Sequence, residues 1–177
     1  KIGIDLETKD PNLEDMGPGS IRKDGYPVGI SLATDTGFKG YYPFAHEIGG
    51  NMNKEQVLAY FKEQLANPNL TVIGANIKYD LEWLRFHGIR VNGKLRDVQI
   101  AEPLIDEESP DGYSLNALCR KYLGREKDET LLRDAAATFG FNPKGELWRL
   151  HSKYVGAYAE FDAACLLDIH AAQEKII

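Results

Sequence analysis

Two acidic side chains lie close together at the start of the chain, where they could bind a cation. The opening stretch KIGIDLET is typical of a strand, in which side chains alternate between the two faces. The apolar residues 2, 4 and 6 then share one face, whereas Asp5 and Glu7 share the other. Like charges this close repel each other and raise a pKa unless a cation lies between them.

A third acid follows a later apolar strand, in the stretch NIKYD at residues 76–80. Asn76 is positioned to cap the helix that starts here, and Asp80 lies about one turn inside that helix. A carboxylate near a helix N-terminus is also favoured by the helix dipole, by a few tenths to about 1 kcal/mol. Asp80 alone is therefore explained without a role in chemistry.

A fourth acid lies within the apolar stripe of the last predicted helix. The stripe follows steps of 3, 4, 3 and 4 through Val155, Tyr158, Asp162, Cys165 and Ile169. A buried carboxylate normally becomes protonated, pairs with a base or binds a metal. The sequence leaves two alternatives for Asp162: an ion pair with an Arg or Lys, or a metal site. Tyr158, one turn earlier, shares its face, although a tyrosine on such a stripe is ordinarily a core residue.

Taken together, the four acids predict a metal site. Four carboxylates gathered at one end of a sheet would serve no stable structural purpose without cations. The set contains only oxygen ligands, with no His or Cys, and such sites suit Mg²⁺ or Mn²⁺ and not zinc.

Composition limits the class of protein. The 177 residues carry a net charge of −6, which argues against a domain that holds nucleic acid by charge alone. Cys119 and Cys165 have no metal-ligand spacing, and we interpret them as reduced packing residues. With no apolar run long enough for a membrane helix and no signal-peptide pattern, we expect a cytoplasmic protein without membrane contact.

The element pattern predicts one α/β domain with a mixed sheet covered by helices. Residues 2–7 form the first strand, 9–26 a long surface loop, and 26–44 two strands around a turn at 35–37. Asn53 caps a helix that ends before Pro68, residues 70–76 form a buried strand, and Gly88 ends the following helix. Further helices are expected at 97–106, 113–123, 130–139 and 155–176.

Three segments of the chain resemble a known family. DLET at 5–8, NIKYD at 76–80 and YAEFD at 158–162 are similar to the three exonuclease motifs of the DEDDy class of 3′→5′ exonucleases. Residues 28–47, 72–89 and 113–124 also resemble the proofreading domain of family A, DNA polymerase I-like polymerases. The resemblance is weakest around Gly17 and over residues 125–150.

The resemblance implies an RNase H-like fold, a central mixed sheet flanked by helices, and hydrolysis of the terminal phosphodiester at a single-stranded 3′ end of DNA. It implies two divalent cations, Mg²⁺ or Mn²⁺. Asp5, Glu7 and Asp162 would hold the first, Asp5 would bridge to the second, and Asp80 would support the second. Tyr158 would orient the attacking water.

The resemblance also implies contacts with the substrate. Glu7 and the backbone at Thr8 would contact the 3′-hydroxyl, and Asn76 and Tyr79 would lie beside the last nucleotides. Leu6, Leu13 and Leu131 are candidate wedges against the terminal base. Four basic residues are candidate phosphate contacts, although solvated surface charge explains them as well: Lys78, Arg120, Lys121 and Arg125.

Alternative functions remain open. Because the chain starts at Lys1, inside a strand, we expect residues 1–177 to be a single exonuclease domain from a longer chain, with a polymerase domain after residue 177. An RNA-trimming exonuclease similar to RNase D would have the same site residues. An inactive, structural domain is the third alternative, but a scaffold gains nothing from four mutually repelling carboxylates.

Overall fold

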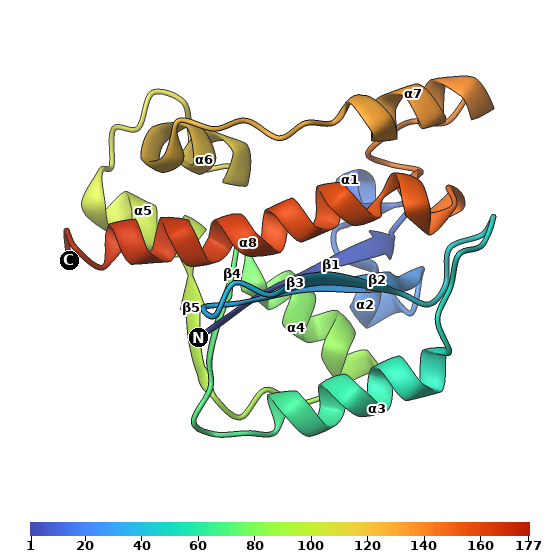
Figure 1. The fold of residues 1–177 in the computed structure, drawn as a ribbon, viewed down its shortest axis with the longest axis horizontal. Helices are drawn as coiled ribbons and strands as arrows, with labels where there is room; N and C mark the ends of the chain where they lie inside the picture. The colour runs from blue at the N-terminus through green and yellow to red at the C-terminus, as the bar shows by residue number, and fades with distance from the viewer.

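The computed structural model describes residues 1–177, and its centre is one mixed sheet of five strands in the order β3-β2-β1-β4-β5 (Figure 1). The neighbours of β1 run antiparallel on the β2 side and parallel on the β4 side, and β5 continues the parallel side. This confirms the predicted mixed sheet and the hairpin at 35–37. The strands are β1 (Ile2–Lys9), β2 (Tyr26–Thr34), β3 (Lys39–Pro43), β4 (Thr71–Gly74) and β5 (Lys94–Asp97).

Two helices cover one face of the sheet, α3 (Lys54–Leu65) and α4 (Ile77–Phe86) (Figure 1). The side chains of Ile4 and Leu6 point to this face and join one buried cluster with Phe61 and Trp83. As predicted, Asn53 caps α3: its side chain accepts a hydrogen bond from the Gln56 N–H at 3.0 Å. The apolar half of the β1 alternation therefore forms the main core, which leaves the acidic half to the opposite face.

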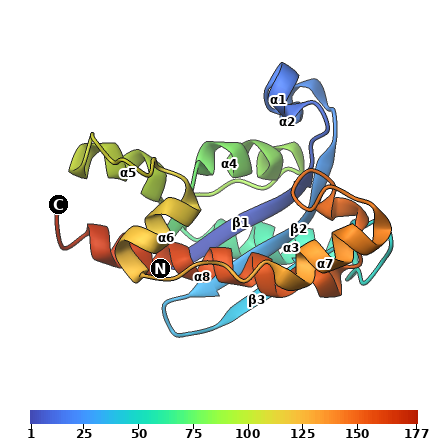
Figure 2. The ribbon, with the colours of Figure 1, turned by 90° about the horizontal axis from the view of Figure 1, so that it is seen from above.

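The opposite face is covered by the long helix α8 (Gly156–Gln173), against which α5 (Val98–Ile105) and α6 (Leu115–Leu123) pack. Helix α7 (Thr130–Phe139) packs on the segment that precedes α8. Single 3₁₀ turns at Leu147–Arg149 and Ser152–Tyr154 lead into α8. The segment that joins α6 to α7 runs alongside α8, while α4 lies on the other side of β1 (Figure 2). None of the helices is both long and apolar enough to cross a bilayer.

The structure differs from the predicted elements in two places. The expected loop at 9–26 contains two single-turn helices, α1 (Leu13–Met16) and α2 (Gly19–Arg22). Strand β5 was missed because it is a short edge strand whose sequence KLRD is mostly exposed and has no apolar alternation.

The predicted cap of α4 was also wrong. Asn76 lies at the N-cap position in the left-handed region, with φ 52°, but its side chain makes no capping hydrogen bond. The Ile77 N–H donates instead to Asp97 Oδ2 at 2.7 Å, while Asp97 Oδ1 accepts from the Gln99 and Ile100 N–H groups. One carboxylate at the end of β5 therefore caps both α4 and α5, an arrangement that only strand pairing creates.

Candidate active site

Three carboxylates meet where β1 passes under α8. Asp5 and Glu7 come from the β1 face that points toward α8, and Asp162 comes from α8 itself. One oxygen atom from each of the three lies within 4.8 Å of the others. Glu7 is only 7% exposed and Asp162 only 3%, so the group is largely shielded from water.

Close packing of α8 on β1 brings these side chains together. A Cβ atom on Gly3 would lie 2.4 Å from the Ala163 carbonyl oxygen, so the absence of a side chain lets the helix backbone approach the strand. Ala163 follows Asp162 directly, and Gly3 lies two residues before Asp5 on the same face. The close approach therefore occurs next to the acids that it joins.

Asp80 lies beside this group without being one of its three members. It is buried in the first turn of α4, and its Oδ1 accepts a hydrogen bond from the Leu6 N–H at 3.0 Å. Burial raises its pKa well above the ordinary value, and the charge of Asp5 raises it further. The fourth acid is thus fixed to β1 at the residue between Asp5 and Glu7.

The electrostatics of the group suit a cation. Burial, and next the charge of Asp162, raise the pKa of Asp5 to about 7. Burial followed by the charges of Asp5 and Asp162 likewise raises the pKa of Glu7. Glu7 Oε1 is buried without a hydrogen-bonding partner. Three carboxylates with oxygens this close, one of which has a buried oxygen that makes no hydrogen bond and no ion pair, fit a hard divalent ion.

A lysine that the sequence analysis missed lies against this centre. Lys127, in the segment between α6 and α7, places its Nζ 2.5 Å from Asp162 Oδ1, and its side chain is only 8% exposed. This contact is an ion pair whose angles fall outside hydrogen-bond geometry, since the same oxygen has no hydrogen-bonding partner. No signal in the sequence distinguishes it: in the run REKDE, a lysine is ordinarily a solvated surface residue.

Lys127 and the nearby acids change one another's pKa. Burial raises the pKa of Asp162 and outweighs the opposing effect of the nearby Lys127 and Lys144 ammonium groups. Burial opposes the charged form of Lys127, but the nearby Asp162, Asp5 and Glu7 outweigh it and raise its pKa above the ordinary value. One of the two alternatives that the sequence left for Asp162, an ion pair with a basic residue, is therefore present in the structure, and it lies within the acidic group itself.

Tyr158 lies one turn before Asp162, as expected. Its hydroxyl accepts a hydrogen bond from Lys144 Nζ at 2.9 Å, and the Lys127 and Lys144 ammonium groups lie 4.6 and 4.4 Å from its ring centre. Burial, and then the charges of Glu7 and Asp162, raise its pKa. Tyr158 is therefore a neutral phenol next to the carboxylates.

The expected substrate contacts lie in different environments. The Thr8 and Tyr79 hydroxyls are 2.9 Å apart, and Tyr79 also donates to Asp10. Tyr79 and Asn76 line a pocket of about 330 Å³ together with Leu13. Leu6 is a correction: its side chain is 6% exposed and belongs to the core, so it offers almost no surface to a base. Leu131 is half exposed.

The four basic candidates are all paired with acids. Lys121 contacts Glu102 and Asp106 at 2.6 and 2.7 Å. The other three pair with acids at the surface: Arg125 with Asp168 at 2.8 Å, Arg120 with Glu126 at 3.9 Å and Lys78 with Glu82 at 4.0 Å. Lys121 is therefore a structural residue, because its partner Glu102 is fully buried.

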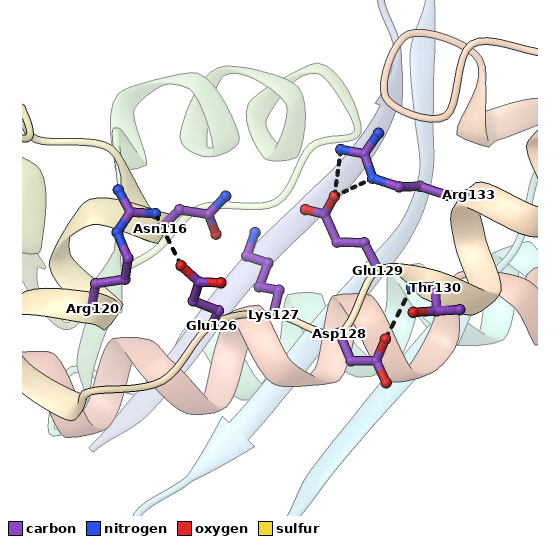
Figure 3. A pocket seen from close by; sticks show the side chains of 8 residues that line it. All are labelled: Asn116, Arg120, Glu126, Lys127, Asp128, Glu129, Thr130 and Arg133. Carbon is purple, nitrogen blue, oxygen red and sulfur yellow. Dashed lines mark hydrogen bonds and ion pairs between the residues drawn. The ribbon is translucent and has the colours of Figure 1, made fainter.

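A second pocket, of about 340 Å³, has no hydrophobic lining (Figure 3). It lies between α6 and the start of α7 and contains Lys127. In Figure 3 the Lys127 side chain projects between Asn116 and Glu129, whereas Asp128 points the other way. Each pocket is linked to the site by one of its lining residues: Lys127 contacts Asp162, and Tyr79 contacts Thr8, which follows Glu7 in the chain.

Comparison with known proteins gives the family. A model of the 3′–5′ exonuclease family matches residues 2–177. A DNA-directed DNA polymerase of Pseudomonas phage M6 is 43% identical over 100% of this chain, and DNA polymerase I of Pseudomonas aeruginosa is 26% identical over 82% of it. The chain spans 27% and 16% of the lengths of these two relatives.

Solved structures agree on the fold. A nuclease in its apo form has a TM-score of 0.68 at 16% identity, and Brucella melitensis NrnC bound to pGG has 0.66 at 17%; each comparison covers 99% of this chain and 72% of the other. At these identities the likeness concerns the fold alone, and it confirms the expected RNase H-like architecture. On the evidence of the family match, the chain belongs to the 3′–5′ exonucleases of DNA polymerase I-like proteins and is a nuclease.

Proposed function

We propose that the chain is the proofreading domain of a DNA polymerase and removes nucleotides from single-stranded 3′ ends of DNA with two divalent cations. The observation that supports this proposal is that one carboxylate oxygen from each of Asp5, Glu7 and Asp162 lies within 4.8 Å of the other two. The polymerase relatives support a polymerase domain in the same chain, because this domain spans only about a quarter of the phage M6 enzyme.

The acids would divide between two cations. Asp5, Glu7 and Asp162 would hold the first, and Asp5 and Asp80 the second. Bound there, Mg²⁺ or Mn²⁺ would supply Lewis-acid activation of water and stabilisation of the leaving 3′ oxygen. The chain's own contribution is to keep the carboxylates close and shielded: Asp80 is fixed by the Leu6 N–H, and Asp162 by the packing of α8 on Gly3.

Tyr158 would orient the attacking water. Its raised pKa keeps the phenol protonated near neutral pH, so it cannot act as the base. Lys144 donates to its oxygen, which leaves the phenol O–H free to donate to another group. A protonated tyrosine held in this way positions water by hydrogen bonding and does not remove the water's proton.

The 3′ nucleotides would bind on the α4 side of the acids. Glu7 and the Thr8 backbone would receive the 3′-hydroxyl, and the pocket lined by Leu13, Asn76 and Tyr79 would receive a base. Leu13 and the Tyr79 ring give this otherwise mostly polar pocket a surface on which any base can stack, so it suits removal of nucleotides irrespective of sequence.

RNA is the second candidate substrate. The fold similarity to Brucella melitensis NrnC bound to pGG favours keeping it, since an RNase D-like enzyme would have the same acids. The 43% identity to a phage DNA polymerase supports DNA as the first candidate.

The test is hydrolysis of matched single-stranded DNA and RNA oligonucleotides labelled at the 5′ end, with Mg²⁺ and with chelator. We expect a Mg²⁺-dependent ladder that shortens from the 3′ end of DNA and forms much more slowly with RNA. Asp162→Ala should abolish the ladder, while Asp168→Ala, on the exposed side of the same helix, should keep it. Faster cleavage of RNA would replace proofreading by RNA trimming, and cleavage in chelator would refute the metal mechanism.

A further inference from the structure

The acidic centre already contains a cation supplied by the chain. The Lys127 ammonium lies 2.5 Å from Asp162 Oδ1. At 8% exposure, this lysine is as well shielded as the acids that it faces. A buried ammonium is stable only where carboxylates compensate its charge, and these carboxylates in turn need a cation.

A metal ion and this ammonium compete for the same position. A divalent ion held by Asp162 would use the same carboxylate that Lys127 Nζ now contacts. The two cations would then repel each other across a shielded site, where charges are screened much less than at the surface. Occupation by one therefore disfavours occupation by the other.

The structure provides a place to which the lysine can move. Lys127 lines the polar pocket of about 340 Å³ between α6 and α7 (Figure 3). Asn116, on the wall of that pocket, has a buried side-chain oxygen without a hydrogen-bonding partner. An ammonium that leaves Asp162 can therefore stay in a polar environment without unfolding of the segment.

We propose that Lys127 is a resident cation of the active site: it neutralises the acids while no metal is bound, and metal binding displaces it into the adjoining pocket. The inference rests on the proposed metal site. It makes Lys127 a positioning residue that keeps the carboxylates together before the metal arrives, and it makes metal affinity depend on the cost of moving one side chain.

The first test measures Lys127 directly. The protein is treated with an amine-reactive ester in chelator and in saturating Mg²⁺, without DNA, and modification is quantified by peptide mass spectrometry. We expect modification of Lys127 to rise about fivefold or more with Mg²⁺, the lower end of ordinary coupling between two sites. Lys121, whose ion pairs lie outside the site, should show no change.

The second test is a stability cycle with a matched control. Lys127→Met should lower Tm in chelator and much less in Mg²⁺, because the metal then replaces the missing ammonium. Lys121→Met also breaks an ion pair with a buried glutamate, so it should lower Tm equally in both conditions.

Calorimetry with Mg²⁺ separates the possible failures. If the wild-type protein binds no Mg²⁺, the proposed metal mechanism and this inference both fail. If it binds Mg²⁺ while Lys127 stays unmodified and the two variants respond alike, only the resident-cation inference is overturned.

Discussion

Gly3→Ala tests the packing that assembles the active site. The added Cβ would lie 2.4 Å from the Ala163 carbonyl oxygen and 3.3 Å from Leu166 Cβ. The closer distance is about 1 Å short of ordinary contact, and the obstacle is backbone, which cannot rotate away. Helix α8 must therefore move away from β1, and it carries Asp162 with it.

The displacement has a cost in stability and a larger cost in activity. Overpacking of this kind destabilises by about 1–3 kcal/mol, or roughly 3–10 °C in Tm for a domain of this size. A shift of about 1 Å between catalytic groups lowers rates by about 100-fold. We expect Gly3→Ala to remain folded but to hydrolyse a 3′ end about 100 times more slowly.

The assay is single-turnover hydrolysis of a 5′-labelled DNA oligonucleotide at saturating Mg²⁺, with Tm measured in parallel. The matched control is Gly156→Ala on the same helix, where an added Cβ would be 3.9 Å from Tyr41, an ordinary contact. This control should retain the wild-type rate and Tm or gain slightly in stability. Wild-type hydrolysis by folded Gly3→Ala would refute the claim that close packing of α8 sets the position of Asp162.

Three further changes test other parts of the structure. Tyr158→Phe removes the phenol O–H and should lower the hydrolysis rate by about 10²-fold while leaving Mg²⁺ affinity, measured by calorimetry, unchanged. Asp97→Ala removes the cap of both α4 and α5 and should destabilise by about 2 kcal/mol, with faster hydrogen exchange at the Ile77 and Gln99 amides. Burial lowers the pKa of His46 to about 4 from 6.5, so the unfolded state binds the proton first as pH falls. Wild-type stability should therefore decrease by about 3 kcal/mol between pH 7 and pH 4 from this group, a contribution that His46→Gln removes.

For each of these three predictions, one outcome would contradict it. An unaltered rate for Tyr158→Phe would mean that the phenol does not hold the water. Faster exchange at only one of the two helices in Asp97→Ala would show that the shared cap stabilises a single element. Denaturant titrations of wild type and His46→Gln that stay parallel from pH 7 to pH 4 would show that His46 is not kept neutral by folding.

The local pattern of the sequence was sufficient for most elements. Alternation in β1 placed Asp5 and Glu7 opposite the apolar residues, and the stripe of α8 placed Asp162 toward the sheet. The helix 130–139 and the cap at Asn53 were also predicted correctly. These features depend on periods of two and 3.6 residues and on contacts three residues apart, and such information is present within a short segment.

The tertiary structure determined which residues these segments contact. The partner of Asp162 is Lys127, 35 positions earlier in a charged run, and its place depends on the path of the segment between α6 and α7. The cap of α4 comes from Asp97 because β5 pairs beside β4, and Gly3 matters only because α8 crosses it closely. The sequence thus determined which side chains point inward. The course of the loops between the elements determined which of these side chains form ion pairs and hydrogen bonds with one another, because contacts between distant residues leave no local periodic signal.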